Sequence, residues 1–209
     1  MFKMRNINVS EIESLISELC IKANKKLPEA LECKIRECGK IEKSAVGRAV
    51  FDDLCANIGA AKSEDLPICQ DTGMTVVFLE VGQEVHLIGG SLEDAVHKGI
   101  RQGYTNGYLR KSVVAEPLFE RKNTTDNSPG VIHTRIVPGD KVRIRLAPKG
   151  AGSENKSVLK MLVPADGIEG VKKVVIEAVK NAGASSCPPM VVGVGIGGTM
   201  DMAALCAKK

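Results

Sequence analysis

Residues 75–81 read Thr75-Val76-Val77-Phe78-Leu79-Glu80-Val81. Most of these side chains are β-branched or aromatic, and such side chains favour an extended backbone. The run follows Leu66-Pro67, and the residues before that point carry the helical spacing of apolar side chains. It therefore predicts a strand that opens the second part of the chain.

The part of the chain that precedes Pro67 is rich in helical periodicity. Along residues 12–19, apolar side chains recur at spacings of three and four, which places them on one stripe of a helix. Further helical stretches extend to about Gly59. We therefore expect residues 1–65 to form a helical N-terminal region and residues 66–209 a mixed α/β region, with both parts in one compact unit.

Two extended segments downstream are separated by the turn Pro138-Gly139-Asp140. They cover residues 131–137 and 141–146, and the second alternates apolar with basic residues, which is typical of a half-buried strand. We expect these two segments to pair as a β-hairpin. A hairpin argues against a purely parallel sheet.

The last third of the chain alternates in the same way between extended and helical patterns. Strands are predicted at residues 158–163 and 190–196, and helices along residues 168–179 and after Thr199. The expected fold class is therefore α/β (mixed α+β), with a helical N-terminal part followed by a mixed-sheet part with one β-hairpin.

The composition narrows the functional classes. The 209 residues carry a net charge of +4, and 44% of them are hydrophobic. Basic residues are dispersed and aromatic residues are few, whereas a nucleic-acid-binding surface usually clusters both. No apolar run is long enough to span a membrane, and we expect no secretory signal, because an acidic helix rather than an apolar run follows Lys3 and Arg5. We expect a partner that is neither nucleic acid nor membrane, and a small anionic substrate fits the charge.

The cysteines indicate a reducing compartment. There are seven, an odd number at irregular spacing, and none forms a Cys-x-x-Cys pair. Such thiols serve as core residues or metal ligands more often than as disulfides. We therefore expect a cytoplasmic protein.

The densest group of reactive side chains lies in residues 67–73, immediately before the predicted strand. Cys69 is a soft metal ligand, and Gln70, Asp71 and Thr72 add an amide, a carboxylate and a hydroxyl. Pro67 and Gly73 restrict and turn the backbone around them. The alternative is an ordinary polar turn beside a buried cysteine.

Three further positions are candidates. Cys187 precedes two prolines, in a turn suited to a cluster ligand; Gly152 lies in a loop, residues 149–156, whose backbone could approach an anion. Arg110 could pair with a carboxylate. The alternatives are a plain loop cysteine, a flexible solvated loop and a solvated helix end. The polar stretch at residues 122–128 is expected to be an exposed loop.

A competing motif occurs at residues 193–198, which satisfy G-x-G-x-x-G between a predicted strand and a predicted helix. That is the local context of a dinucleotide-binding fingerprint. Only eleven residues follow it, too few for a second strand and a ribose-binding acid. We therefore favour the interpretation that these glycines permit a tight turn.

Taken together and in this order, the motifs resemble the class I (iron–sulfur) fumarase/L(+)-tartrate dehydratase family, in its α-subunit or N-terminal half. The resemblance covers nearly the whole chain. It implies a [4Fe–4S] cluster with three cysteine ligands, of which Cys69 and Cys187 match two and the third lies outside this chain. The chain is thus expected to be C-terminally truncated, and the cluster to be absent or incomplete in it. The resemblance assigns Asp71 to catalysis, and substrate contacts to Gln70, Arg110 and Gly152.

The implied function is a hydro-lyase that reversibly dehydrates a 2-hydroxy dicarboxylate, malate or tartrate. The implied partner is a β-subunit, in an assembly of two α- and two β-subunits or in a dimer. Without that subunit and the missing part, the chain is expected to be inactive. Two alternatives remain open at this point: a cluster-free, catalytically silent assembly or regulatory module, and a dinucleotide-binding protein that uses residues 193–198.

Overall fold

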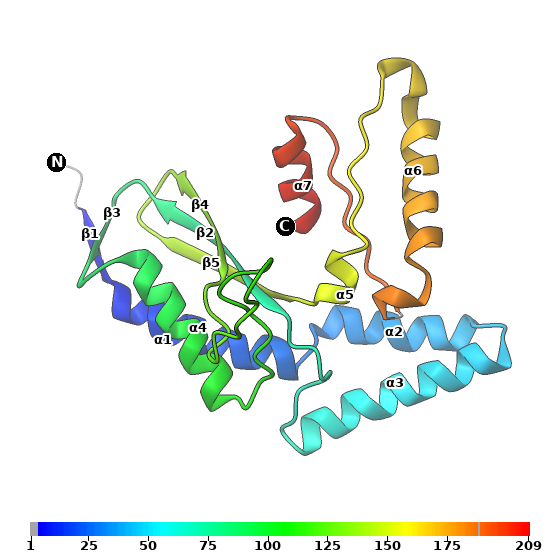
Figure 1. Ribbon diagram of the computed structural model, residues 1–209, viewed down its shortest axis with the longest axis horizontal. Coiled ribbons are helices and arrows are strands. Elements are labelled where there is room, and N and C mark those ends of the chain that lie inside the picture. Colours follow the sequence, from blue (N-terminus) through cyan, green and yellow to red (C-terminus); the bar gives the residue numbers. More distant parts are fainter. Residues whose placement is uncertain (1–3, 188) are drawn as a thin grey trace. The chain divides into compact units, whose positions relative to one another are not determined.

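The computed structural model describes residues 4–187 and 189–209 and has a mixed α/β fold, as predicted (Figure 1). It comprises two units, one ending at Lys149 and the other beginning at Gly150. The division thus differs from the expected one near residue 65. The physical reason is that the first helix packs into the same core as the sheet, so the helical part is not separate from the strands that follow.

The first unit contains four helices and two sheets among its described residues. Its elements are β1 (Arg5–Asn8), α1 (Val9–Lys25), α2 (Glu29–Ile41), α3 (Ala45–Ser63), β2 (Met74–Gly82), β3 (Val85–Ile88), α4 (Leu92–Asn106), β4 (Val131–Val137) and β5 (Val142–Lys149). The strand expected at residues 75–81 is therefore confirmed as β2.

Strand β2 is the central strand of a three-stranded sheet with the order β4-β2-β5. It pairs parallel with β4 and antiparallel with β5, while β1 and β3 form a separate parallel pair. The predicted hairpin between β4 and β5 is therefore wrong, although both strands exist. The residues that connect them hydrogen-bond instead to the end of β2 and just beyond it: Gly82 N–H donates to Lys141 O and Glu84 N–H to Gly139 O, at 2.9 and 3.0 Å.

Helices α1 and α4 cover one face of this sheet. Val77, Leu79 and Val81 alternate along β2 toward them, because side chains two residues apart share a face of a strand. The helices contribute the other half of this core, including Ile12, Ile16, Cys20, Val96, Ile100 and Tyr104. On the opposite face, Phe78 stacks on His133 with ring centroids 5.2 Å apart.

The second unit contains α5 (Ala151–Glu154), α6 (Gly167–Ala182) and α7 (Met200–Lys208), with 3-10 turns at Pro164–Asp166 and Gly183–Ser186. The strands predicted at residues 158–163 and 190–196 are wrong, since neither segment pairs as a strand among the described residues. A strand requires a hydrogen-bonded neighbour, which local sequence does not supply. Most apolar side chains of both segments are exposed.

The glycines at residues 193–198 serve the packing of α7. A Cβ atom at Gly193 would lie 1.9 Å from Ala207 O, and one at Gly195 would lie 2.0 Å from Ala203 O. Only glycine therefore allows this segment to lie so close to the helix backbone. No strand directly precedes this segment in the described part of the chain, so it lacks the context of a dinucleotide fingerprint. The structure instead favours the interpretation that these glycines permit a tight turn.

The two units differ in how much of a hydrophobic core they possess. Among the described residues from Gly150 onward, Ala182 alone is a buried hydrophobic residue, whereas the first unit buries a contiguous cluster. None of the helices in the described ranges is long and apolar enough to cross a membrane.

This difference predicts unequal stability of the two units when they are produced separately. A fragment of residues 1–149 should unfold cooperatively on heating, because it retains the buried cluster. A fragment of residues 150–209 should show no cooperative transition, because a small unit with so little buried apolar surface cannot offset its conformational entropy. Circular dichroism during thermal unfolding measures both. A sharp transition in the shorter fragment would contradict the prediction.

Candidate functional site

The loop at residues 67–73 has two successive turns, each closed by a side chain. The Asp71 N–H donates to Cys69 Sγ at 3.4 Å, and the Gly73 N–H donates to Asp71 Oδ1 at 3.0 Å. Gly73 has a φ of +60°, a conformation that glycine adopts without strain. The loop thus orients a thiol and a carboxylate while Cys69 and Gln70 remain exposed.

Two helices anchor the beginning of this loop through the backbone of Ile68. Its N–H donates to the carbonyl oxygen of Asn24, near the end of α1, at 2.9 Å. Its carbonyl oxygen accepts a hydrogen bond from Asn57 Nδ2, on α3, at 2.8 Å. The residue before Cys69 is therefore fixed at both of its backbone groups.

Arg110 lies on the segment that follows α4 and is joined to the same loop. Thr72, whose side chain is buried, donates from Oγ1 to the carbonyl oxygen of Arg110 at 2.7 Å. The Arg110 side chain is exposed. The first unit therefore brings together four predicted site residues, namely Cys69, Gln70, Asp71 and Arg110.

The other two predicted site residues lie together in the second unit. Cys187 is exposed and has a φ of +53°, which is uncommon for a residue other than glycine. Gly152 lies against the same segment, since a Cβ atom there would be 3.1 Å from Ser185 O. The loop expected around Gly152 contains the single helical turn α5. Pro188 lies outside the described residues.

Cys69 and Cys187 belong to different units, so their approach to one another stays a prediction. Among the described residues, no three side chains of the types His, Cys, Asp and Glu converge as a metal site would require. The structure describes two groups of candidate site residues, one in each unit. One carries a thiol, an amide, a carboxylate and a guanidinium, and the other carries a thiol beside a glycine backbone.

The sequence did not predict two buried residues that support the candidate site residues of the first unit. Asn127 is 0% exposed, so the expectation that residues 122–128 form an exposed loop is wrong at its end. Its side chain contacts both Gly73 and Ser112. Tyr104 on α4 contacts Thr72. Tyr104 could have been found from its helical spacing with Val96 and Ile100, whereas no sequence signal marks Asn127.

Cysteine thiolates are ligands that soft metals prefer, and the arginine guanidinium can pair with a carboxylate. The sequence model of the family "Fumarate hydratase (Fumerase)" matches residues 13–209. The chain belongs to this family of hydro-lyases, which confirms the resemblance of its motifs.

Relatives with more specific names are similar over almost the whole chain. The "Putative L(+)-tartrate dehydratase subunit alpha" of Methanocaldococcus jannaschii is 38% identical over 205 residues, which cover 95% of this chain and 71% of that protein. The "L(+)-tartrate dehydratase subunit alpha" of Escherichia coli and that of Shigella sonnei are each 27% identical over 205 residues, covering 96% of this chain and 67% of those proteins.

The cysteines differ sharply in their surroundings, and all seven are free. Cys20 is 0% exposed in the core of the first unit, and burial raises the pKa of its thiol to about 12. A buried thiol of this kind is inert, whereas exposed thiols such as Cys69 and Cys187 are accessible to reagents.

This contrast predicts the order in which iodoacetamide modifies the native chain at neutral pH. Cys69 and Cys187 should react early, and Cys20 should react at least roughly a hundredfold more slowly, because both access and thiolate formation are suppressed there. Mass spectrometry of peptides over time measures each rate. In denaturant the difference should vanish, which serves as the control. Equal rates for Cys20 and Cys69 in the native protein would refute the prediction.

Proposed function

We propose that the chain is the α-subunit of a hydro-lyase that reversibly dehydrates a 2-hydroxy dicarboxylate at a [4Fe–4S] cluster. The substrate pair is malate and fumarate, or tartrate and oxaloacetate. The observation that supports the proposal is the hydrogen bond from Thr72 Oγ1 to Arg110 O, by which the backbone of Arg110 adjoins the Cys69–Asp71 turn in a member of the fumarate hydratase family.

The donor chemistry of the residues present fits such a cluster. Cys69 and Cys187 are exposed thiols on loops, and the Asp71 N–H already points at the Cys69 sulfur. Hydrogen bonds to sulfur are among the features by which proteins tune iron–sulfur clusters. We propose these two cysteines as two of the three ligands. When bound, an open iron of the cluster supplies Lewis acidity at the departing hydroxyl group.

Arg110 is proposed to bind one carboxylate of the substrate. Its guanidinium is exposed, while its backbone is held by the buried Thr72. A charge-assisted, bidentate pair with a carboxylate would fix the orientation of the reacting carbons. The Gln70 amide and the Gly152 backbone are proposed as further polar contacts to the substrate.

Asp71 is proposed to carry a proton during the reaction. Dehydration removes a proton from one carbon and hydroxide from its neighbour, so a group that accepts or returns a proton is required. Asp71 Oδ1 accepts a hydrogen bond from the Gly73 N–H, which restricts the orientation of the carboxylate. An anionic side chain would repel a dicarboxylate, so a role in binding alone would not explain it.

A β-subunit is the proposed partner, because the relatives are named as α-subunits. The exposed apolar side chains in the second unit, among them Met161, Val191 and Ile196, fit a surface that another polypeptide covers. Seven free cysteines fit the reducing conditions of the cytoplasm, which is the proposed location.

The proposed function is tested by anaerobic reconstitution of an α-subunit that carries all three cysteine ligands with its β-subunit, ferrous iron and sulfide. The reconstituted protein should convert malate to fumarate or (+)-tartrate to oxaloacetate, and the ratio of the two kcat/KM values identifies the substrate. The chain alone, treated in the same way, should be inactive. An assembled protein with a full iron content that converts neither substrate would refute the proposal in favour of a silent module.

The roles of Asp71 and Arg110 predict different kinetic defects. Asp71→Asn should lower kcat by about 10²-fold or more with little rise in KM, the usual scale of acid–base assistance. Arg110→Ala should also raise KM, since a hydrogen bond between charged groups contributes roughly 1.5–3 kcal/mol in both ground and transition states. Steady-state kinetics at matched iron content measures both. If Asp71→Asn keeps a normal kcat, its carboxylate serves only to shape the turn.

A further inference from the structure

Three buried side chains join the loop at residues 67–73 to α4 and to the segment that carries Arg110. They are Thr72, Tyr104 and Asn127, each almost completely shielded from solvent. The exposed groups of the candidate site therefore lie above a polar network that solvent does not reach. Buried networks whose members are satisfied rigidify their surroundings.

Asn127 hydrogen-bonds to three backbone groups on two segments of the chain. Its Nδ2 donates to Gly73 O at 3.0 Å, at the end of the cysteine loop. Its Oδ1 accepts from the Ser112 N–H at 2.7 Å and from the Val113 N–H at 3.3 Å, two and three residues beyond Arg110. A single amide therefore spans both segments, and it uses both its donor and its acceptor to do so.

Tyr104 supports the same loop from α4. Its hydroxyl oxygen lies 2.6 Å from Thr72 O and 3.2 Å from Gly73 O and donates toward them. Burial raises the pKa of this phenol, so the hydroxyl keeps its proton and remains a donor. Thr72 in turn donates to Arg110 O. The two segments are thus connected twice, once through Asn127 and once through Thr72, while Tyr104 holds the loop to α4.

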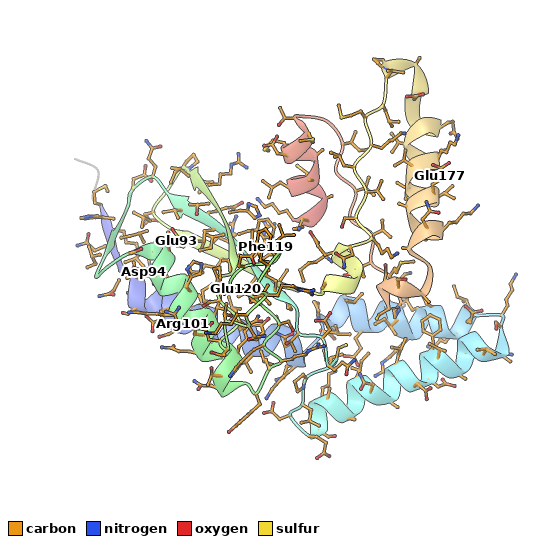
Figure 2. The ribbon with its side chains drawn as sticks, viewed as in Figure 1. Glu93, Asp94, Arg101, Phe119, Glu120 and Glu177 are labelled. Carbon is orange, nitrogen blue, oxygen red and sulfur yellow. The ribbon has the colours of Figure 1, made fainter. Side chains whose placement is uncertain are left out.

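The position of Asn127 is itself fixed. Asp126 Oδ1 accepts from the Ser128 N–H at 2.9 Å and from Ser128 Oγ at 2.7 Å, which closes a turn around Asn127. Arg101 on α4, labelled in Figure 2, forms an ion pair with Asp126 at 3.8 Å. Asn127 has a φ of +62°, a conformation that asparagine adopts more readily than most residues.

We propose that Asn127 is a positioning residue that holds Arg110 in register with Cys69 and Asp71. It does not reach the substrate, and it acts through the backbone at Gly73, Ser112 and Val113. Its effect on turnover rests on the proposed function, whereas its effect on the two segments does not.

The connection is tested first in the full chain without a cluster. Asn127→Gly removes the amide and still permits the positive φ, and Thr72→Val removes the second connection with little change in shape. Val96→Ala, which truncates a fully buried side chain of the same core, is the control for lost stability. Hydrogen exchange is followed at the amides of Ser112 and Val113 and at residues 71–73.

Asn127→Gly should accelerate exchange at these amides by about tenfold or more beyond the control, because each has lost its buried partner or its anchor. Thr72→Val should accelerate exchange at residues 71–73 by a smaller factor. If neither variant exceeds Val96→Ala in these segments, the proposed connection is refuted. If Asn127→Gly does not fold, Asn127→Asp, which keeps the shape of the side chain but removes the Nδ2 donor to Gly73 O, replaces it in the same comparison.

The second test uses the reconstituted enzyme and a double-mutant cycle with Arg110→Ala. If Asn127 acts through Arg110, the two losses in kcat/KM should be clearly less than multiplicative, and Val96→Ala should combine with Arg110→Ala multiplicatively. Fully multiplicative losses would overturn the positioning role. A wild-type enzyme without dehydratase activity would refute the proposed function, and the exchange experiment would then still decide whether Asn127 connects the segments.

Discussion

The burial of strand β2 is the constraint on which the first unit depends. A strand with apolar side chains on both faces needs a hydrogen-bonded neighbour at each edge and a covering layer, and β4, β5 and the two helices α1 and α4 meet these needs. Because β2 begins at Met74, directly after Gly73, the strand that organises the core also fixes where the cysteine loop ends. The cysteine loop is thus attached directly to the buried central strand of this unit, and regular elements hold site residues more precisely than loops do.

The sequence predicts elements well where a local pattern decides them. The apolar run at residues 75–81 and the alternation at residues 141–146 are strands in the structure. Pairing is a different matter, because it depends on distant partners. A turn at Pro138–Asp140 is compatible with a hairpin, yet β2 needs both flanking strands, and inserting it between them satisfies more backbone groups. The segments at residues 158–163 and 190–196 have strand patterns but no strand neighbour among the described residues.

The same distinction applies to the site. The candidate site residues of the first unit could be predicted because each residue type has a recognisable chemical role by itself. They are Cys69, Gln70, Asp71 and Arg110. Asn127 could not be predicted, since a polar stretch between two elements is normally solvated. Its burial accompanies its hydrogen bonds to three backbone groups, those of Gly73, Ser112 and Val113, which lie far from it in the sequence. Residues that support a site are therefore harder to predict than those that act in it.

The uneven burial of apolar side chains in the two units bears on how the proposed cluster would be acquired. Cys69 belongs to a unit with a contiguous hydrophobic core, whereas Cys187 belongs to one in which Ala182 alone is a buried hydrophobic residue among those described. A ligand on a poorly packed segment must be ordered before it can bind, and the free energy of metal binding then contributes to folding. On the proposed ligand set, loss of the cluster would release the second unit far more than the first. The core beneath Arg110 would remain folded, because its stability derives from β2 and the helices that cover it.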